Sequence, residues 1–576
     1  IYADTPEDLF RAQGYVQAQD RFFEMDYRRH VTSGRLAELV GDNPDAIAAD
    51  TVTRTFGWRQ VAEEEWDVVS PETKAYLQAY AEGVNAYLED RSPSEIALEY
   101  TVLGLQVDVA EPEPWDPVDS LAWLKAMAWD LRGNYDDELD RALAYGTLQD
   151  TARVAELFPA YPSELNAPIL DPGELENPQE VALDLGPQAR AEYGSDHLQA
   201  ALEAADRALG AVPVLIGRGE GTGSNSWVVS GEHTASGKPI LANDPHLALG
   251  APGIWAQVGL HCNEGAPACG FDVAGFSFAG FPGVVIGHNA QLAWGLTNMG
   301  ADVTDFFVER VRDDTYLRGD EWVPLETRTE TLRVAGGDDV EIEVRSTLHG
   351  PIVPEAIPAT DAAVDTPALD TRLGEYAVAL QWTALEPGRT ADAVFAFNLA
   401  QDAEDMQAAA ALFEVPAQNI VFATADGHIG YQAPGKIPVR QAVPDAEVPS
   451  DGTWPRDGSD ERYDWQGYVP SEEMPRVVDP AEGFIVAANQ AVLPDGVAPF
   501  LTTDWDYGYR SQRIRQLLEA EIAAGRTVDV DTMNEVQVDD RSPYAEVLVQ
   551  PLLEQEIDDD FAAEGQPLLA ASVSYT

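Results

Sequence analysis

The sequence predicts an α+β protein whose first part is mainly helical and whose later part is built mainly of strands. Between residues 8 and 150, apolar residues recur at the spacing of one helix face. From residue 224 onward, short runs rich in Val, Ile, Phe and Trp alternate with Gly, Pro and Asp turns, which is typical of strands. No segment repeats at the period of a solenoid or a propeller. The chain has 576 residues, of which 45% are hydrophobic, enough for a sizeable core.

The first helix is predicted to begin at Thr5, which precedes a proline and two acidic residues, a helix-start signal. Its apolar pattern continues to Arg29, and a second short helix ends at Gly41. Residues 60–150 are also helical in pattern, with breaks at two proline-containing points. Within them, residues 123–131 are apolar on most faces, so we expect them to be buried.

The middle of the chain is predicted to connect the two parts. Residues 151–200 are rich in Pro, Glu and Ala, a helix is expected over 198–210, and 211–223 are loop-like. Strands are then expected in these runs: 226–230, 276–287, 292–296, 306–311, 340–344, 420–423 and 483–488.

The composition is extremely acidic and excludes some partners. With 100 Asp and Glu against 35 Lys and Arg, the formal net charge is −65, and only four of the basic residues are lysines. Such a surface repels nucleic acids and anionic membranes. A dispersed excess of carboxylates predicts an organism living in high salt, where screening removes the self-repulsion. The alternative is an ordinary acidic secreted protein.

No apolar run is long enough to span a membrane, and the first residues do not resemble a signal peptide. We expect that the natural protein begins before Ile1 and continues beyond Thr576. Two cysteines, Cys262 and Cys269, flank a Gly-Ala-Pro segment that suits a turn. They predict a local disulfide in an extracellular or periplasmic protein, with two free buried thiols as the alternative.

Ser224 stands at the start of a predicted strand, directly after the glycine-rich stretch that ends at Gly223. Glycine permits almost any backbone angle before the serine. If the chain were cut between these two residues, Ser224 would carry both a hydroxyl and a free α-amine. An α-amine has a reference pKa of about 7.7–8.0, so it can serve as the base for its own hydroxyl. On the tripeptide alone, the alternative is an ordinary turn before a strand.

The motifs Gly223-Ser224-Asn225-x-Trp227 and Asn243-x-Pro245-His246 resemble the β-chain start of the penicillin acylase (penicillin amidase) family. Members of this family are N-terminal-nucleophile (Ntn) hydrolases, and they include cephalosporin acylases and acyl-homoserine-lactone acylases. The resemblance extends from Ile1 to about residue 515. It implies the αββα sandwich of Ntn hydrolases and a precursor that cleaves itself into an α-chain and a β-chain.

Carried over by position, the resemblance assigns a role to several residues. Ser224 is the nucleophile, and the backbone N–H of Asn298, in the 287–298 segment, is one oxyanion donor. The side chain of Asn489, after 484–488, is the second donor, and Arg510 supports the site. The next residue, Gln490, departs mildly from the asparagine common in the family. His246 stands where the family has His or Gln near the amine.

The resemblance also implies a pocket and a metal site. Leu247 and Ile286 match positions that line the acyl pocket, and both are aliphatic. Glu138 matches a glutamate that helps to bind calcium. Two carboxylates and a carbonyl, from Asp302, Asp305 and Thr304, would complete a hard oxygen site suited to a structural Ca²⁺. From the residues alone, the alternative is surface acids in a very acidic chain.

The resulting prediction is an α/β heterodimer made from one precursor: residues 1–190 as an α-chain-like helical region, about 191–223 as a spacer, and 224–576 as the Ntn core, truncated at its end. It would hydrolyse a small N-acyl amide, such as a penicillin, through an acyl-enzyme, without an organic cofactor. One alternative is an acyl-homoserine-lactone acylase. Others are a Ser-His-Asp hydrolase, weakened by the lack of a Gly-x-Ser-x-Gly motif, and an inactive, unprocessed acyl-binding homologue.

Overall fold

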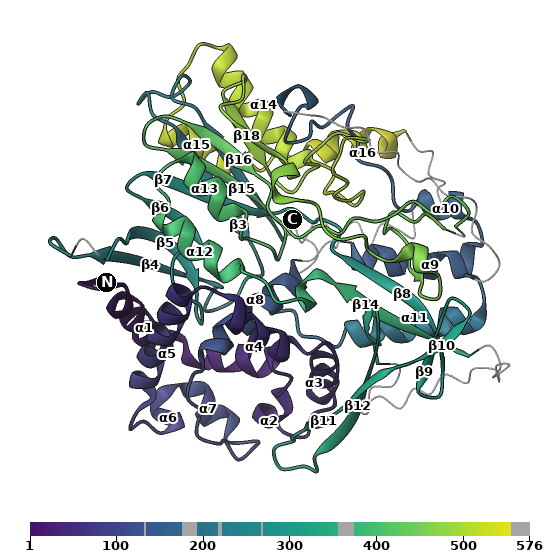
Figure 1. Ribbon diagram of the computed structural model, residues 1–576. Coiled ribbons are helices and arrows are strands. Elements are labelled where there is room, and N and C mark those ends of the chain that lie inside the picture. The colour runs from purple at the N-terminus through teal and green to yellow at the C-terminus, as the bar shows by residue number, and fades with distance from the viewer. Residues whose placement is uncertain are drawn as a thin grey trace.

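A computed structural model describes residues 1–131, 134–175, 193–216, 222–266, 269–354, 374–446 and 448–554. Helices α1 to α7 (residues 6–103) gather in the lower part of the view in Figure 1, and the strands lie among further helices, with α14 (Tyr509–Ala523) and α15 (Val530–Gln537) at the opposite end. The α+β class predicted from the sequence is confirmed. The glycine-rich approach before Thr222, the predicted start of the spacer and the last 22 residues lie outside the described residues.

The N-terminal half of the chain is helical, as predicted. The hydroxyl of Thr5 caps the first helix by accepting a hydrogen bond from the N–H of Asp8, so the predicted start is confirmed. The helices before the strand-rich part are α1 (Pro6–Thr32), α2 (Leu36–Val40), α3 (Pro44–Phe56), α4 (Trp58–Val68), α5 (Pro71–Leu88), α6 (Pro93–Ile96), α7 (Leu98–Leu103), α8 (Pro117–Asp130), α9 (Tyr135–Leu148), α10 (Thr151–Ala155) and α11 (Asp196–Leu209).

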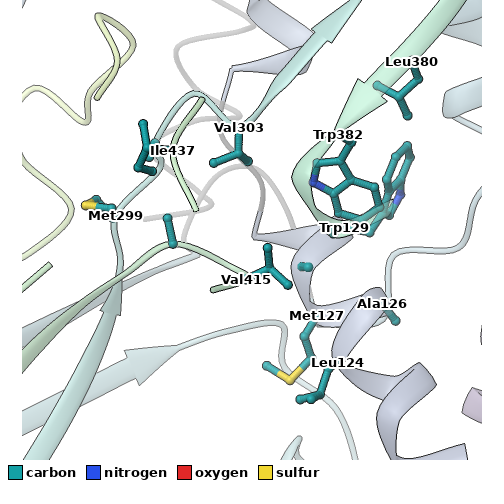
Figure 2. Close-up of a cluster of buried hydrophobic side chains, with 14 of the residues drawn as sticks. Leu124, Ala126, Met127, Trp129, Met299, Val303, Leu380, Trp382, Val415 and Ile437 are labelled. Carbon is teal, nitrogen blue, oxygen red and sulfur yellow. The ribbon is translucent and has the colours of Figure 1, made fainter. Parts of the chain in front are cut away.

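Helix α8 runs through the centre of the protein, and its residues from Val118 to Trp129 are all buried. This agrees with the prediction that its apolar sequence is a core segment. Trp129 packs against Trp382 with ring centroids 5.5 Å apart, in the cluster shown in Figure 2. Leu124 and Met127 project from the same helix in that view. The packing of its aromatic side chains therefore holds helix α8 in the hydrophobic core.

Helix α11, which falls within the predicted spacer, is part of the core. Its inner face buries Leu198, Leu202, Ala205, Ala208 and Leu209. The segment after it is also fixed, because the carboxylate of Asp130 accepts the backbone N–H groups of Leu215 and Ile216.

Four sheets form the strand-rich part. An eight-stranded sheet has the order β1-β4-β5-β6-β7-β15-β16-β18, and a three-stranded sheet has the order β19-β2-β3. Their strands are β1 (Tyr2–Ala3), β2 (Gly223–Val229), β3 (Ile240–His246), β4 (Trp255–Cys262), β5 (Asp272–Phe278), β6 (Ile286–Asn289), β7 (Leu292–Asn298), β15 (Gln418–Thr424), β16 (Ile429–Gln432), β18 (Arg476–Val478) and β19 (Phe484–Ala487). A third sheet holds β8 (Thr304–Arg312), β9 (Thr315–Arg318), β10 (Glu321–Pro324), β14 (Glu375–Trp382) and β17 (Arg456–Asp457). A fourth holds β11 (Glu326–Leu332), β12 (Val340–Thr347) and β13 (Gly350–Pro351).

The first two sheets and the helices on their outer faces form four layers. Strand β7 contacts β2 and β3, so the two sheets lie face to face. Helices α14 (Tyr509–Ala523) and α15 (Val530–Gln537) cover the outer face of the small sheet in one apolar cluster. Helices α1, α5, α12 (Thr390–Leu399) and α13 (Ala403–Ala410) share another cluster with the eight-stranded sheet. This order is the predicted αββα sandwich. Helix α16 (Pro543–Leu553) follows α15.

One predicted strand is wrong in detail. The run 276–287 is two strands, β5 and β6, because a turn lies between them. Gly280 and Gly283 have φ angles of 105° and 88° on either side of Pro282, a backbone that a continuous strand does not contain.

Cys262 and Cys269 form a disulfide with Cα atoms 5.7 Å apart. None of the helices that the structure describes is long and apolar enough to cross a bilayer.

Candidate active site

The candidate active site lies where the two sheets meet. Ser224 is the second residue of β2 and pairs with Pro245 of β3. Its side chain is only 4% exposed. The predicted nucleophile therefore stands at the end of a strand that is hydrogen-bonded on both edges, to β3 and β19. A strand in this position holds its side chains rigidly.

Two donors converge on the hydroxyl of Ser224. The backbone N–H of Asn298, at the end of β7, lies 3.2 Å from Oγ. The side-chain Nδ2 of Asn489 lies 3.2 Å from the same oxygen. These are the two groups that the sequence assigned as oxyanion donors, and they come from different sheets. They lie beside Oγ, where they could donate to the carbonyl oxygen of a substrate whose carbonyl carbon is bonded to Oγ.

Arg510 holds the backbone around Ser224. Its Nη1 donates to the carbonyl of Ser224 at 3.0 Å and to Oδ1 of Asn225 at 2.8 Å. Its Nη2 donates to Oδ1 of Asn489 at 2.9 Å. The same Oδ1 accepts the N–H of Ser224 at 2.9 Å. The guanidinium thus fixes the nucleophile and one donor in a single network, as the predicted supporting role requires.

Gly223 is closely enclosed by two side chains. A methyl group on its Cα would lie 2.9 Å from Nε2 of His246 and 3.1 Å from Nη2 of Arg510, so no larger residue fits without a shift. The Nδ1 of His246 bonds the carbonyl of Asp244 at 2.9 Å, which leaves Nε2 facing Gly223. The pKa of Asp244 is lowered, mainly because the side chain of Asp244 interacts with His246 through a hydrogen bond.

Asn243 is a positioning residue. It belongs to the Asn243-x-Pro245-His246 motif, but no role was predicted for it from the sequence. Its Nδ2 donates to the carbonyl of Leu296 at 3.0 Å and to that of Asn225 at 2.9 Å. Its Oδ1 accepts the N–H of Leu296 at 3.2 Å. The side chain therefore joins β3 to β7 across the two sheets. A methyl group on Gly295 would lie 2.8 Å from Asn243, so the glycine permits this close approach.

An apolar cavity of about 70 Å³ opens beside Ser224. Leu247 and Ile286 both line it, as predicted. Helix α8 contributes one wall through Leu124, Met127 and Leu131. None of its described lining residues is charged, and the polar ones are Ser224, Asn298, Thr390 and Gln418.

Aromatic side chains complete the wall of this cavity, and sequence reasoning missed them. Trp255, Phe278, Phe281 and Phe413 come from β4, β5 and two loops. Trp255 stacks on Phe278 with ring centroids 4.4 Å apart. The sequence predicted the phenylalanines near residue 280 to lie in a strand. The alternation of side chains along a strand does not reveal which face of the strand borders a cavity.

The predicted metal residues form a separate buried cluster. The carboxylates of Asp302 and Asp305 bind Arg440 at 2.5 and 2.8 Å, and Glu138 accepts the N–H of Phe306 at 2.9 Å. Glu138 Oε2, Asp302 Oδ2 and Asp305 Oδ1 are buried and have no hydrogen-bond partner. Burial and the neighbouring Asp305 raise the pKa of Glu138, and burial raises that of Asp302 despite Arg440.

This cluster fits a hard cation in its donors and its charge. Three buried carboxylate oxygens without partners are the ligands that Ca²⁺ prefers. The carbonyl of Thr304 lies 3.4 Å from Nη2 of Arg440, so all four predicted ligands are gathered here. In the part of the chain that the structure describes, however, no three Asp, Glu, His or Cys side chains form a ready metal-ligand group. Calcium therefore stays a prediction.

Comparison with known proteins gives a consistent result. The family model of penicillin amidase matches residues 1–571. An acyl-homoserine lactone acylase, QuiP, of Pseudomonas aeruginosa is 32% identical over 94% of this chain and 59% of its own length. The penicillin acylase 2 proenzyme of Pseudomonas sp. (strain SE83) is 31% identical over 95% of this chain and 64% of its own.

The penicillin G acylase of Escherichia coli is 29% identical, with coverages of 90% and 61%. A solved structure, the thermostable penicillin G acylase from Alcaligenes faecalis in orthorhombic form, has a TM-score of 0.45 and 24% identity, and the match covers 58% of this chain and 56% of that one. The chain spans about 60% of the length of the curated relatives it matches. The match over nearly all its residues shows that the chain belongs to the penicillin amidase family.

Proposed function

We propose that the protein cleaves itself between Gly223 and Ser224 and then hydrolyses amides of apolar carboxylic acids. The observation that carries this proposal is the pair of donors, Asn298 N–H and Asn489 Nδ2, each 3.2 Å from Ser224 Oγ at the mouth of an apolar cavity. A nucleophile, an oxyanion hole and an acyl pocket are then in one place.

In the proposed reaction, the Ser224 hydroxyl attacks the amide carbonyl and its α-amine accepts the proton. Arg510 is so near that its charge disfavours protonation of an amine at this position, which keeps the amine in the neutral form that can accept a proton. Asn298 and Asn489 stabilise the oxyanion of the tetrahedral intermediate. The protonated α-amine gives that proton to the leaving nitrogen as the C–N bond breaks, and water then hydrolyses the acyl-enzyme through the same steps.

Before the cut, the chain has no α-amine at Ser224, so another group must receive the proton. His246 faces the scissile residue with Nε2, while its Nδ1 bonds a backbone carbonyl. We propose that His246 serves as this acceptor during self-cleavage. The hydrogen bonds of the Ser224 hydroxyl in the described structure go to Asn298 and Asn489, and none goes to a histidine. This disfavours a conventional Ser-His-Asp hydrolase.

The cavity limits the acyl group. A wall without charged residues would leave the carboxylate of a dicarboxylic acyl chain unpaired, so neutral chains are favoured. Its volume of about 70 Å³ is below the roughly 150 Å³ of a cavity that binds benzene, so short chains enter most easily. A flexible methionine, Met127, is the wall residue best able to move for a larger group. Short acyl-homoserine lactones are the second candidate substrates, because one similar relative is an acylase of that class.

The experiment that tests this proposal is intact mass and N-terminal sequencing of the purified chain, together with hydrolysis of penicillin G, penicillin V and acyl-homoserine lactones of graded length. We expect two chains, one of which begins at Ser224. The variant Ser224→Ala should stay uncut and inactive. Ser230→Ala is the matched control, because Ser230 directly follows the same strand and its buried hydroxyl has no hydrogen-bond partner. Turnover by an uncut chain, or processing of Ser224→Ala, contradicts the proposal. An uncut, inactive chain that still binds acyl compounds favours the binding homologue.

We further propose that the mature protein is an α/β heterodimer with a structural calcium ion at Glu138, Asp302, Thr304 and Asp305. The disulfide between Cys262 and Cys269 supports an extracellular or periplasmic location. The net charge of −65 supports adaptation to high salt. Unfolding midpoints measured at low and molar NaCl test that adaptation.

A further inference from the structure

We infer that Asn419 is a positioning residue for the oxyanion hole and acts through the backbone of Asn298. This inference rests on the function proposed above and adds a residue to it. Asn419 is the second residue of β15 and is completely buried. It pairs with Thr297 in the antiparallel ladder, and Gln418 pairs with Asn298 in the last register position of that ladder.

The side chain of Asn419 clamps the end of β7. Its Nδ2 donates to Oγ1 of Thr297 at 3.1 Å and to the carbonyl of Asn298 at 3.3 Å. These two acceptors stand on consecutive residues, and the peptide group between them carries the N–H that points at Ser224. The clamp therefore fixes the orientation of that peptide group through contacts on both residues that it joins.

A second buried group fixes Asn419 in turn. The hydroxyl of Tyr431, on β16, donates to Oδ1 of Asn419 at 2.6 Å, and Tyr431 is completely buried. The amide of Asn419 thus uses its donor and acceptor sides at once, and only one orientation satisfies both. Such a fully paired network in a dry interior holds a single geometry.

The carbonyl of Asn298 needs this support because the regular ladder ends there. It accepts Nδ2 of Asn489 at 2.7 Å as well as Nδ2 of Asn419. Asn489 thus contacts both the carbonyl of Asn298 and the hydroxyl of Ser224. If Asn419 were lost, Asn489 would be the one remaining side-chain donor described at this carbonyl, and we expect both oxyanion donors to shift together. A displacement of about 1 Å at a reacting centre can cost about 10²-fold in rate.

The decisive variants are Asn419→Leu, which removes both clamp bonds at similar size, and Tyr431→Phe, which removes only the hydroxyl behind the clamp. We expect kcat to fall about 10- to 100-fold in the first and less in the second, with KM within about twofold of the parent. Thr424→Val is the matched control. Thr424 ends the same strand and is buried and hydrogen-bonded to His428, far along β15 from Asn419. It should lose stability without losing kcat.

Two inhibitors separate positioning from a general structural role. Hexanoate reports the acyl pocket, whereas pentylboronic acid forms a tetrahedral adduct with Ser224 and reports the oxyanion hole. We expect Asn419→Leu to weaken pentylboronic acid at least tenfold and hexanoate by less than twofold. Equal weakening of both, or an unchanged kcat in Asn419→Leu and Tyr431→Phe, overturns the inference. If Asn419→Leu does not fold, the same measurements on Tyr431→Phe decide. A parent protein that neither cleaves itself nor hydrolyses amides overturns the proposed function instead.

Discussion

The two buried polar clusters of this molecule differ in how fully their groups are paired. Around Ser224, hydroxyl, amide and guanidinium groups exchange hydrogen bonds, and Ser224, Asn489 and Arg510 leave no buried side-chain atom unpaired. Around Arg440, two of three buried carboxylates pair with its guanidinium, Arg456 lies 3.5 Å from one of them, and the three carboxylates keep three oxygens without a hydrogen-bond partner. The first cluster is preorganised as it stands, whereas the second requires a proton or a further cation.

This difference teaches which cluster serves chemistry and which serves the fold. Preorganised neutral donors need no rearrangement when charge develops in a reaction. Buried carboxylates of one sign repel each other and are stable only with compensation. Substitutions in the first cluster should therefore change rates, and substitutions in the second should change stability. The predictions below test that separation.

The largest expected effect is on stability, from Arg440→Met. It would leave Asp302 buried without its cation and Asp305 with Arg456, 3.5 Å away, and breaking such a buried pair typically costs about 3–5 kcal/mol. Urea unfolding of the parent and the variant measures the loss. Arg462→Met is the control, because Arg462 pairs with acids at the surface, where solvent screens the interaction, and should contribute far less. Similar losses in both variants would contradict the separation.

Asn489→Ala should act on rate. It removes one oxyanion donor, so we expect kcat to fall about 10²–10³-fold, or about 2.7–4 kcal/mol in the barrier. Kinetics on the processed fraction measure this. The exposed asparagine Asn263, which contacts Asp4 at the surface, provides the control Asn263→Ala with unchanged kcat. A large rise in KM with normal kcat would assign Asn489 to substrate binding instead.

Calcium should stabilise the second cluster and leave the first unchanged. If Ca²⁺ binds only the folded protein, a concentration 100 times its Kd adds about 2.7 kcal/mol. Thermal unfolding with CaCl₂ and with a chelator should therefore differ in the parent, and the difference should vanish in Glu138→Gln. A thermal midpoint that does not respond to either addition would show that the two arginines or bound protons, and not calcium, compensate the carboxylates.

The smallest expected effect is a pH dependence at a third polar site. Nδ1 of His349 lies 2.7 Å from Glu309, and Nε2 lies 3.1 Å from Asp464 and 3.5 Å from Arg318. Burial alone would lower the pKa of His349, but hydrogen bonds with Asp464 and Glu309 raise it.

A raised folded-state pKa stabilises the protein fully below the unfolded-state value of about 6.5, and this stabilisation is lost as pH rises through the folded-state value. Urea unfolding from pH 6 to 9 should show a decrease that His349→Gln lacks. The control is His428→Gln. His428 also pairs with an acid, Asp479, but both are half-exposed and should contribute less. A slope that is the same in His349→Gln and the parent would contradict this role.

Much of the fold could be predicted because local patterns decide it. The capping at Thr5 and the buried strand after Ser224 are signals in adjacent residues. The turn between β5 and β6 was missed because Gly280 and Gly283 act through their φ angles, which an apolar run does not reveal. Helices α12 and α13 were missed because both lie in a part of the chain dominated by strands.

The candidate site could be predicted where the family resemblance supplied roles, as for Asn298, Asn489 and Arg510. Contacts between distant strands could not. The links from Asn243 to Leu296 and from Asn419 to Asn298 join residues 53 and 121 positions apart, and no local pattern predicts such pairs. The cavity's aromatic wall was missed for the same reason, since its members come from separate strands and loops.

The nucleophile and one of its oxyanion donors belong to different sheets, and Asn243 together with Gly295 sets the gap between those sheets. Reactivity is therefore tied to the thickness of the sandwich. If the proposed function holds, any replacement that spreads the layers, even one remote from Ser224, should lower the proposed activity before it unfolds the protein. Selection for variants with a higher rate should therefore find mutations at small residues between the two sheets as well as at residues that line the cavity.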